Sequence, residues 1–188
     1  MNVVYGGAFN PPTIAHYEIA KILKGLPGVS NLIILPVGMK YQKDSLINDD
    51  KRLDMVKLLA KRVNALVSDL ELHNDKYYGT LHTLDELSKS FDDIYFVMGA
   101  DNLLHLDKWI NYETLLDKYN FIVFTRDDID CEKVIDEKFQ KYKDHFLLYP
   151  LHIDVSSTMI RDNIEENKEL LLDEIYEYIK EKGLYEVK

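Results

Sequence analysis

The segment that most constrains the fold lies at the start of the chain, where an apolar run, two glycines and a helical pattern follow one another. Val3–Tyr5 predicts a buried strand, and Gly6 and Gly7 permit a sharp turn close to a ligand because they carry no Cβ. From Tyr17 to Leu26 the apolar residues recur at helical spacing. A strand, a glycine turn and a helix direct free backbone N–H groups and the positive end of the helix dipole at one point, which suits a phosphate. The segment therefore predicts a nucleotide-handling enzyme.

The rest of the chain alternates between strand and helix patterns. Continuous apolar runs are typical of strands buried on both faces of a parallel sheet, and they lie at residues 3–5, 32–35, 65–67, 94–98, 121–124 and 146–149. Helical patterns lie at residues 51–63, 81–91, 109–119, 159–163 and 169–182, and residues 127–144 read as a charged surface helix. The alternation predicts an α/β fold, a doubly wound Rossmann-like parallel sheet with helices on both faces and a C-terminal helical segment. Ligands in such sheets bind where the strand order reverses, at the carboxyl ends of the strands.

Composition narrows the class of protein. The 188 residues predict a single domain over 1–188, with 46% hydrophobic and 30% charged residues as in ordinary globular proteins. A net charge of −10 argues against a nucleic-acid partner, because polyanions bind basic patches. The chain lacks an apolar run of membrane length and a signal-peptide pattern, so we expect no membrane partner and a cytoplasmic location. The one cysteine, Cys131, lies among acidic residues and is expected to be inert. Assembly into a homo-oligomer stays open.

The residues after the glycine pair carry the first chemical motif, which runs G-G-A-F-N-P-P-T-I-A-H from Gly6 to His16. Thr13 suits a helix N-cap, and His16 follows three residues later on the same helical face. We expect the hydroxyl and the imidazole to project toward one site. The alternative is a capped strand–turn–helix with an incidental histidine. This alternative leaves the presence of Phe9 and Asn10 in the same segment as His16 unexplained.

Two further motifs follow the predicted strands. Ser156, Ser157 and Thr158 precede a helical start and can cap it or donate to an anion, and Arg161 adds a guanidinium one turn later. The other motif starts at the end of the strand at 94–98, where Gly99 permits a close turn and Asp101 can cap the next helix or accept from a ribose hydroxyl. The only tryptophan, Trp109, follows; its simplest role is core packing.

These motifs together resemble a known family. The first is similar to the G-G-x-F-[DN]-P-x-[HT]-x-G-H signature of nucleotidyltransferases that join ATP to a small phosphate ester, and the second to their I-S-S-T-x-[IV]-R element. G-A-D-N-x-x-x-L-x-x-W resembles bacterial nicotinate-nucleotide adenylyltransferases specifically, and Lys182–Tyr185 resembles the tail of Gram-positive members. The resemblance implies His16, Thr13 and Arg161 as catalytic residues. It implies an ATP site formed by Gly6, Gly7, Ala8, Phe9, Asn10, His16, Gly99, Asp101, Ser156, Ser157, Thr158 and Arg161.

The substrate side of the resemblance is less complete. It implies stacking of the pyridine ring on Trp109 and binding of the nicotinate carboxylate by the turn at Thr80, while Lys40, Lys43 and Arg126 are candidates for the substrate phosphate. Three positions depart from the family: Ala15 replaces a glycine, Gly79 an aromatic residue and His82 an aspartate. We expect ATP and nicotinic acid mononucleotide as substrates, Mg²⁺ bound through the ATP phosphates, and no metal ligands from the protein. The alternatives are phosphopantetheine adenylyltransferase, another small-phosphate adenylyltransferase, and a nucleotide sensor without turnover.

Overall fold

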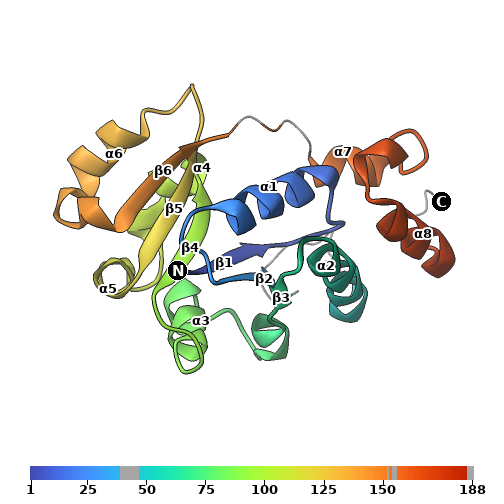
Figure 1. The fold of residues 1–188 in the computed structure, drawn as a ribbon, viewed down its shortest axis with the longest axis horizontal. Helices are drawn as coiled ribbons and strands as arrows, with labels where there is room; N and C mark the ends of the chain where they lie inside the picture. The colour runs from blue at the N-terminus through green and yellow to red at the C-terminus, as the bar shows by residue number, and fades with distance from the viewer. Residues whose placement is uncertain (39–46, 152, 154–155, 186–188) are drawn as a thin grey trace.

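The computed structural model describes residues 1–38, 47–151, 153 and 156–185, and its centre is one sheet of six parallel strands in the order β3-β2-β1-β4-β5-β6 (Figure 1). All six predicted strands are confirmed. They are β1 (Asn2–Gly7), β2 (Asn31–Pro36), β3 (Leu66–Val67), β4 (Ile94–Gly99), β5 (Asn120–Thr125) and β6 (Phe146–Pro150).

Helices cover both faces of the sheet, because successive residues of each strand point to opposite faces. Val3 and Tyr5 pack into one core, and Val4 between them packs into the other. The first core is covered by α1 (Ile14–Gly25), α2 (Asp49–Val63) and α8 (Asp173–Lys182), and the second by α3 (Thr80–Leu87), α4 (Ala100–Leu104), α5 (Tyr112–Lys118) and α6 (Cys131–Lys138). The fold is thus the expected doubly wound sheet.

The strand order reverses beside β1, which pairs with β2 on one side and with β4 on the other. After β6 the chain runs back across the molecule to α7 (Ser157–Asp162) and α8, which Figure 1 shows on the side away from α5 and α6. This return places the second sequence motif near the end of β1, although about 150 residues separate the two in the chain.

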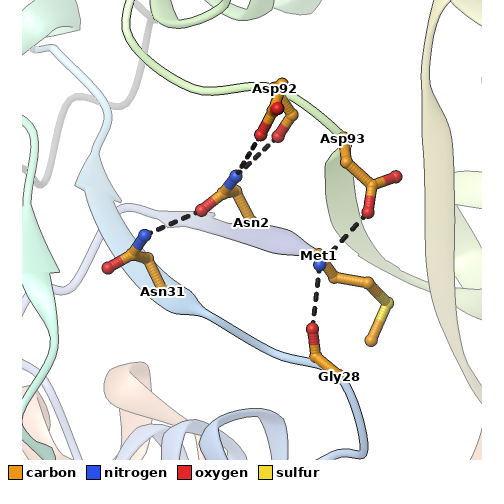
Figure 2. A network of polar contacts seen from close by, with 6 residues as sticks. All are labelled: Met1, Asn2, Gly28, Asn31, Asp92 and Asp93. Atoms are coloured by element: carbon orange, nitrogen blue, oxygen red, sulfur yellow. Dashed lines mark hydrogen bonds and ion pairs between the residues drawn. The ribbon is translucent and has the colours of Figure 1, made fainter.

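The amino ends of the central strands are held together by a polar network on the opposite side from the glycine loop (Figure 2). The Asn2 amide nitrogen donates to the Asp92 carbonyl at 2.6 Å, and the Asn2 side-chain oxygen accepts from Asn31 at 2.8 Å. The Met1 ammonium donates to the Gly28 carbonyl at 2.8 Å and pairs with Asp93 at 3.1 Å. These contacts join β1, the start of β2 and the segment before β4, which fixes the register of the strands that carry the site.

One predicted element is wrong. The stretch 127–144 is not a single surface helix: α6 covers Cys131–Lys138, and a kinked 3₁₀ segment covers Gln140–His145. The break falls at Phe139, which leaves the helical conformation because its ring is buried in the second core. Among the described residues, no helix is long and apolar enough to cross a membrane.

Candidate active site

A cavity of about 760 Å³ opens where the strand order reverses, at the carboxyl ends of β1 and β4. Its size lies within the range of small-molecule and cofactor sites. The walls come from the ends of β1, β4 and β5, from the first turns of α1, and from the segments after β5 and β6. The lining residues are Tyr5, Gly6, Ala15, His16, Ile19, Val97, Met98, Gly99, Asn102, Phe124, Arg126, Asp127, Asp128, Leu151 and Ile153.

The loop between β1 and α1 turns later than the glycine pair suggests. Both Gly6 and Gly7 still belong to β1, and the residue with a left-handed backbone is Phe9, with φ of 47°. The Phe9 ring is buried, packs on the Tyr5 ring at 5.4 Å, and lies 3.2 Å from where a Cβ on Gly7 would stand. Gly7 is therefore needed to seat Phe9, and the Phe9 side chain builds the loop rather than contacting a ligand.

His16 is one of the ionisable groups that line the cavity. Its Nδ1 accepts from the backbone N–H of Thr13 at 2.8 Å, and its ring packs on Phe9 at 4.9 Å. Burial lowers the pKa of His16 to about 4, so the imidazole is neutral at physiological pH. A backbone N–H can only donate, so Nδ1 carries no proton and Nε2 must carry it. His16 is thereby prepared as a hydrogen-bond donor through Nε2.

Thr13 is the N-cap of α1, as predicted, but its hydroxyl does not project into the cavity beside His16. Its Oγ1 accepts from the His16 backbone N–H at 3.4 Å and lies 3.1 Å from Nδ1 of the same ring. The residue is 1% exposed, because the cap draws the hydroxyl back toward the helix. Thr13 therefore positions His16 rather than facing a ligand.

The second motif packs against the loop between β1 and α1. Ser156 caps α7, Ser157 Oγ donates to the Pro11 carbonyl at 3.0 Å, and Arg161 Nη1 donates to the Asn10 carbonyl at 2.8 Å. The other Arg161 nitrogen, Nη2, donates to Thr158 Oγ1 at 3.1 Å. Ser157 and Arg161 thus hold the backbone of the glycine loop, and all four residues lie outside the cavity lining.

Two side chains that the sequence interpretation missed also hold this loop. The Tyr185 hydroxyl donates to the Asn10 side-chain oxygen at 2.6 Å, which ties the segment after α8 to the loop. The Arg52 guanidinium, fully buried, donates to the Ala8 carbonyl at 2.9 Å. A signal for Arg52 exists in the sequence, because a charged residue at position 52 shares the helical face of Val56 and Leu59.

Gly99 lies in the cavity wall as expected, at the end of β4. A Cβ built on Gly99 meets no atom within 4 Å, so this glycine leaves an open space on the wall. Asp101 does not cap α4, whose N-cap is Gly99, and it is exposed. It pairs instead with Arg126 at 3.0 Å, and Arg126 also pairs with Asp128 at 3.1 Å. Asn102, one residue further on, takes the place in the lining that we expected for Asp101.

Thr80 and Trp109 lie outside the cavity lining, and their sequence neighbours Gly79 and Ile110 lie close together. Thr80 begins α3, and the preceding Gly79 has φ of +91° and sits so close to Ile110 that a Cβ would lie 3.2 Å from that side chain. Trp109 packs edge-on against Phe96, whose ring is also the nearest neighbour of a Cβ placed on Gly6. A line of contacts thus leads from the cavity at Gly6 through Phe96 to Trp109.

The remaining predictions concern single residues. Lys40 and Lys43 lie outside the described residues. Cys131 is buried, and burial raises the pKa of its thiol, which agrees with an inert cysteine. Within the described ranges, no group of three or more His, Cys, Asp or Glu side chains is placed to hold a metal ion.

The comparisons with known proteins concern the fold and the family of the chain. A family model described as cytidylyltransferase-like matches residues 4–163, from β1 to the end of α7. A Plasmodium falciparum nicotinic acid mononucleotide adenylyltransferase, solved in complex with NaAD, superposes with a TM-score of 0.76 at 22% identity, covering 98% of this chain and 96% of that one. At this identity the likeness concerns the fold. The chain belongs to the cytidylyltransferase-like family of nucleotidyltransferases.

The sequence relatives define the family more closely. A probable nicotinate-nucleotide adenylyltransferase of Acholeplasma laidlawii is 38% identical over 188 residues, covering 99% of this chain and 98% of the relative. One from Clostridium acetobutylicum is 34% identical over 97% of both chains. Within the cytidylyltransferase-like proteins, this chain is a member of the nicotinate-nucleotide adenylyltransferase family.

Proposed function

We propose that the chain, acting as one nucleotidyltransferase domain over residues 1–188, transfers the adenylyl group of ATP to nicotinic acid mononucleotide. The phosphate oxygen of the mononucleotide attacks the α-phosphorus of ATP, the bond from that phosphorus to the bridging oxygen breaks, and pyrophosphate leaves. The products are nicotinic acid adenine dinucleotide and pyrophosphate. The observation that carries the proposal is a neutral imidazole with its proton on Nε2, set in the wall of a cavity at the reversal point of the sheet.

His16 is the catalytic residue in this proposal. It donates from Nε2 to a phosphate oxygen on which negative charge builds in the transition state, and its ring is held ready by the Thr13 N–H. Arg126 lies in the cavity wall and pairs with two carboxylates, and its guanidinium could release one of them to bind a phosphate group. Arg161 and Ser157 act through the loop that they hold.

Mg²⁺ would bind together with ATP, through the phosphates of the nucleotide. The cavity fits that mode of binding, since its wall offers donors together with Asp127 and Asp128 rather than a preformed ligand cage. When bound, the ion would supply charge neutralisation on the phosphates. The protein's own part is to orient the two substrates and to donate hydrogen bonds.

The mononucleotide specificity is expected to come from the turn at Gly79 and Thr80. Backbone N–H groups at the start of α3 can donate to both oxygens of a nicotinate carboxylate, whereas the amide NH₂ of nicotinamide would face those donors with its own hydrogens. Trp109, the sequence neighbour of the Ile110 that packs against Gly79, offers a ring surface that both forms of the substrate would share.

A panel of acceptors tests the proposal. Pyrophosphate release with ATP is measured with nicotinic acid mononucleotide, nicotinamide mononucleotide and phosphopantetheine. We expect kcat/KM to favour the nicotinate form by up to about 10⁴-fold, as polar mismatches in buried sites do. Preference for phosphopantetheine would identify the alternative transferase. ATP binding without pyrophosphate release from any acceptor would indicate a sensor.

A further inference from the structure

The Arg52 side chain is the largest fully buried side chain among the described residues, and the reaction outlined above does not use it. It stands on α2, on the face that also buries Met55, Val56 and Leu59. An arginine is rarely placed in such a position unless its donors are satisfied, because moving its charge out of water is costly.

Three hydrogen bonds of the Arg52 guanidinium explain how its burial is tolerated. Nη1 donates to the Ala8 carbonyl at 2.9 Å, Nε to the Ile47 carbonyl at 3.3 Å, and Nη2 to the Asp49 carboxylate at 2.6 Å. Two of these acceptors lie at the start of α2, and an arginine there could serve only to close that helix. The third acceptor, Ala8, lies in the glycine loop 44 residues earlier in the chain.

The bond to Ala8 fixes the direction of the next peptide unit. In a trans peptide the C=O and the following N–H point in opposite directions. With the Ala8 carbonyl drawn toward α2, the N–H of Phe9 points away from α2. Phe9 also holds a left-handed backbone, which costs free energy and persists only where the surroundings enforce it.

We infer that Arg52 is a positioning residue for adenylyl transfer: it sets the Ala8–Phe9 peptide so that the Phe9 N–H faces the phosphate chain of ATP. The inference rests on the proposed function, since it assigns ATP to the cavity beside this loop. The guanidinium also places a positive charge behind the loop in a chain whose net charge is −10. Arg52 does not touch the substrate in this arrangement.

The first test compares Arg52→Lys with Arg62→Met, a matched change on the same helix that removes an exposed ion pair to Glu174. A lysine keeps the charge but cannot bond three acceptors at once. We expect Arg52→Lys to weaken ATP binding, measured by calorimetry without an acceptor, and to lower kcat by about 10-fold to 100-fold, the cost of misplacing a reacting group. The mononucleotide KM should stay within about threefold in both variants, as expected for distant, independent sites. Arg62→Met should keep wild-type kinetics.

A folded Arg52→Lys enzyme with wild-type affinity for ATP and wild-type kcat overturns the inference. Arg52 would then serve only to stabilise the start of α2.

The second test needs no variant: the backbone amide signal of Phe9 is followed by NMR while an ATP analogue is added to the wild-type protein. A large shift of that signal is expected, and no shift at saturation overturns the inference. Both binding measurements omit the mononucleotide, so they decide the matter even if the acceptor proves to be another phosphate ester.

Discussion

The state of one imidazole decides how this site can work. The Thr13 N–H occupies Nδ1 of His16, and burial keeps the ring neutral, so its proton is held on Nε2. A protonated imidazole would be the stronger donor, but it could not keep the bond from the Thr13 N–H at the same time. The loop thus keeps His16 neutral and fixes the direction in which Nε2 donates.

The lowered pKa of His16 predicts a pH dependence of stability. The ring binds a proton near pH 6.5 in the unfolded chain and near pH 4 in the folded one. Between these values the unfolded state holds more protons, so the stabilisation is fully present above about pH 6.5 and is lost as the pH falls toward 4. The slope from this group is at most about 1.4 kcal/mol per pH unit.

Urea unfolding of wild type and His16→Gln at pH 7, 6 and 5 measures this slope. The wild type should lose more stability than the variant on acidification. His73→Gln, a change at an exposed histidine that pairs with Asp69, is the control and should behave as wild type. Equal slopes in the wild type and His16→Gln would show that the ring is solvated in the folded state.

Gly99→Ala separates folding from binding at a single residue. The backbone at Gly99, with φ of −85° and ψ of 166°, suits alanine, and the added methyl meets no atom within 4 Å. We expect the melting temperature to hold or rise slightly. The methyl would occupy space in the cavity, so the KM for ATP should rise about 5-fold to 100-fold, which corresponds to about 1–3 kcal/mol of crowding.

Gly25→Ala is the control for that change, because Gly25 is exposed at the end of α1 and its Cβ would also meet nothing. It should leave the KM for ATP unchanged. An unchanged KM in Gly99→Ala as well would mean that the nucleotide keeps clear of this wall.

At the scale of elements, the six strands could be predicted because each is a continuous apolar run between turns. The ends of the helices are harder to predict from the sequence. Residues 127–144 were expected to form one helix, and the burial of the Phe9 and Phe139 rings, which depends on tertiary packing, decides where the backbone bends. The same holds for Arg52, whose partner at Ala8 belongs to another element.

We expect alanine at Gly79, in the turn before α3, to introduce a strain that can be measured. Gly79 and Gly28 both have φ in the left-handed range, at +91° and +82°, but a Cβ on Gly79 would also press on Ile110, whereas one on Gly28 meets nothing. Alanine at either site should destabilise the fold by about 1 kcal/mol through its backbone.

Gly79→Ala should therefore lose about 1–3 kcal/mol more than Gly28→Ala, because of the contact with Ile110. Calorimetric melting of the two variants gives the comparison. Gly79→Ala should in addition raise the KM for the mononucleotide, since the proposed carboxylate site is the turn at Gly79 and Thr80. Equal melting temperatures for the two would mean that Ile110 moves aside freely.

At the scale of the whole molecule, the sequence predicts a site at the carboxyl ends of the strands, where the strand order reverses, and a cavity lies at that point between β1 and β4. The individual roles could not be read from the motifs. Thr13 is consumed by its cap, Arg161 and Ser157 hold loop carbonyls, and Asp101 pairs with Arg126, because each side chain bonds the nearest complementary group that the fold brings to it. Motif spacing carries no information about such competition.

The loop proposed to meet the nucleotide lies before His16, yet its supports come from far along the chain: Arg52, Ser157, Arg161 and Tyr185. During synthesis this loop is made before the residues that support it. A ribosome-bound chain that has completed all six strands still lacks α7 and Tyr185, so it holds the binding sequence without the contacts that shape it. Affinity for the nucleotide should thus arise only after residues 157–185 have been made, and bound nucleotide would favour the docking of that segment by mass action.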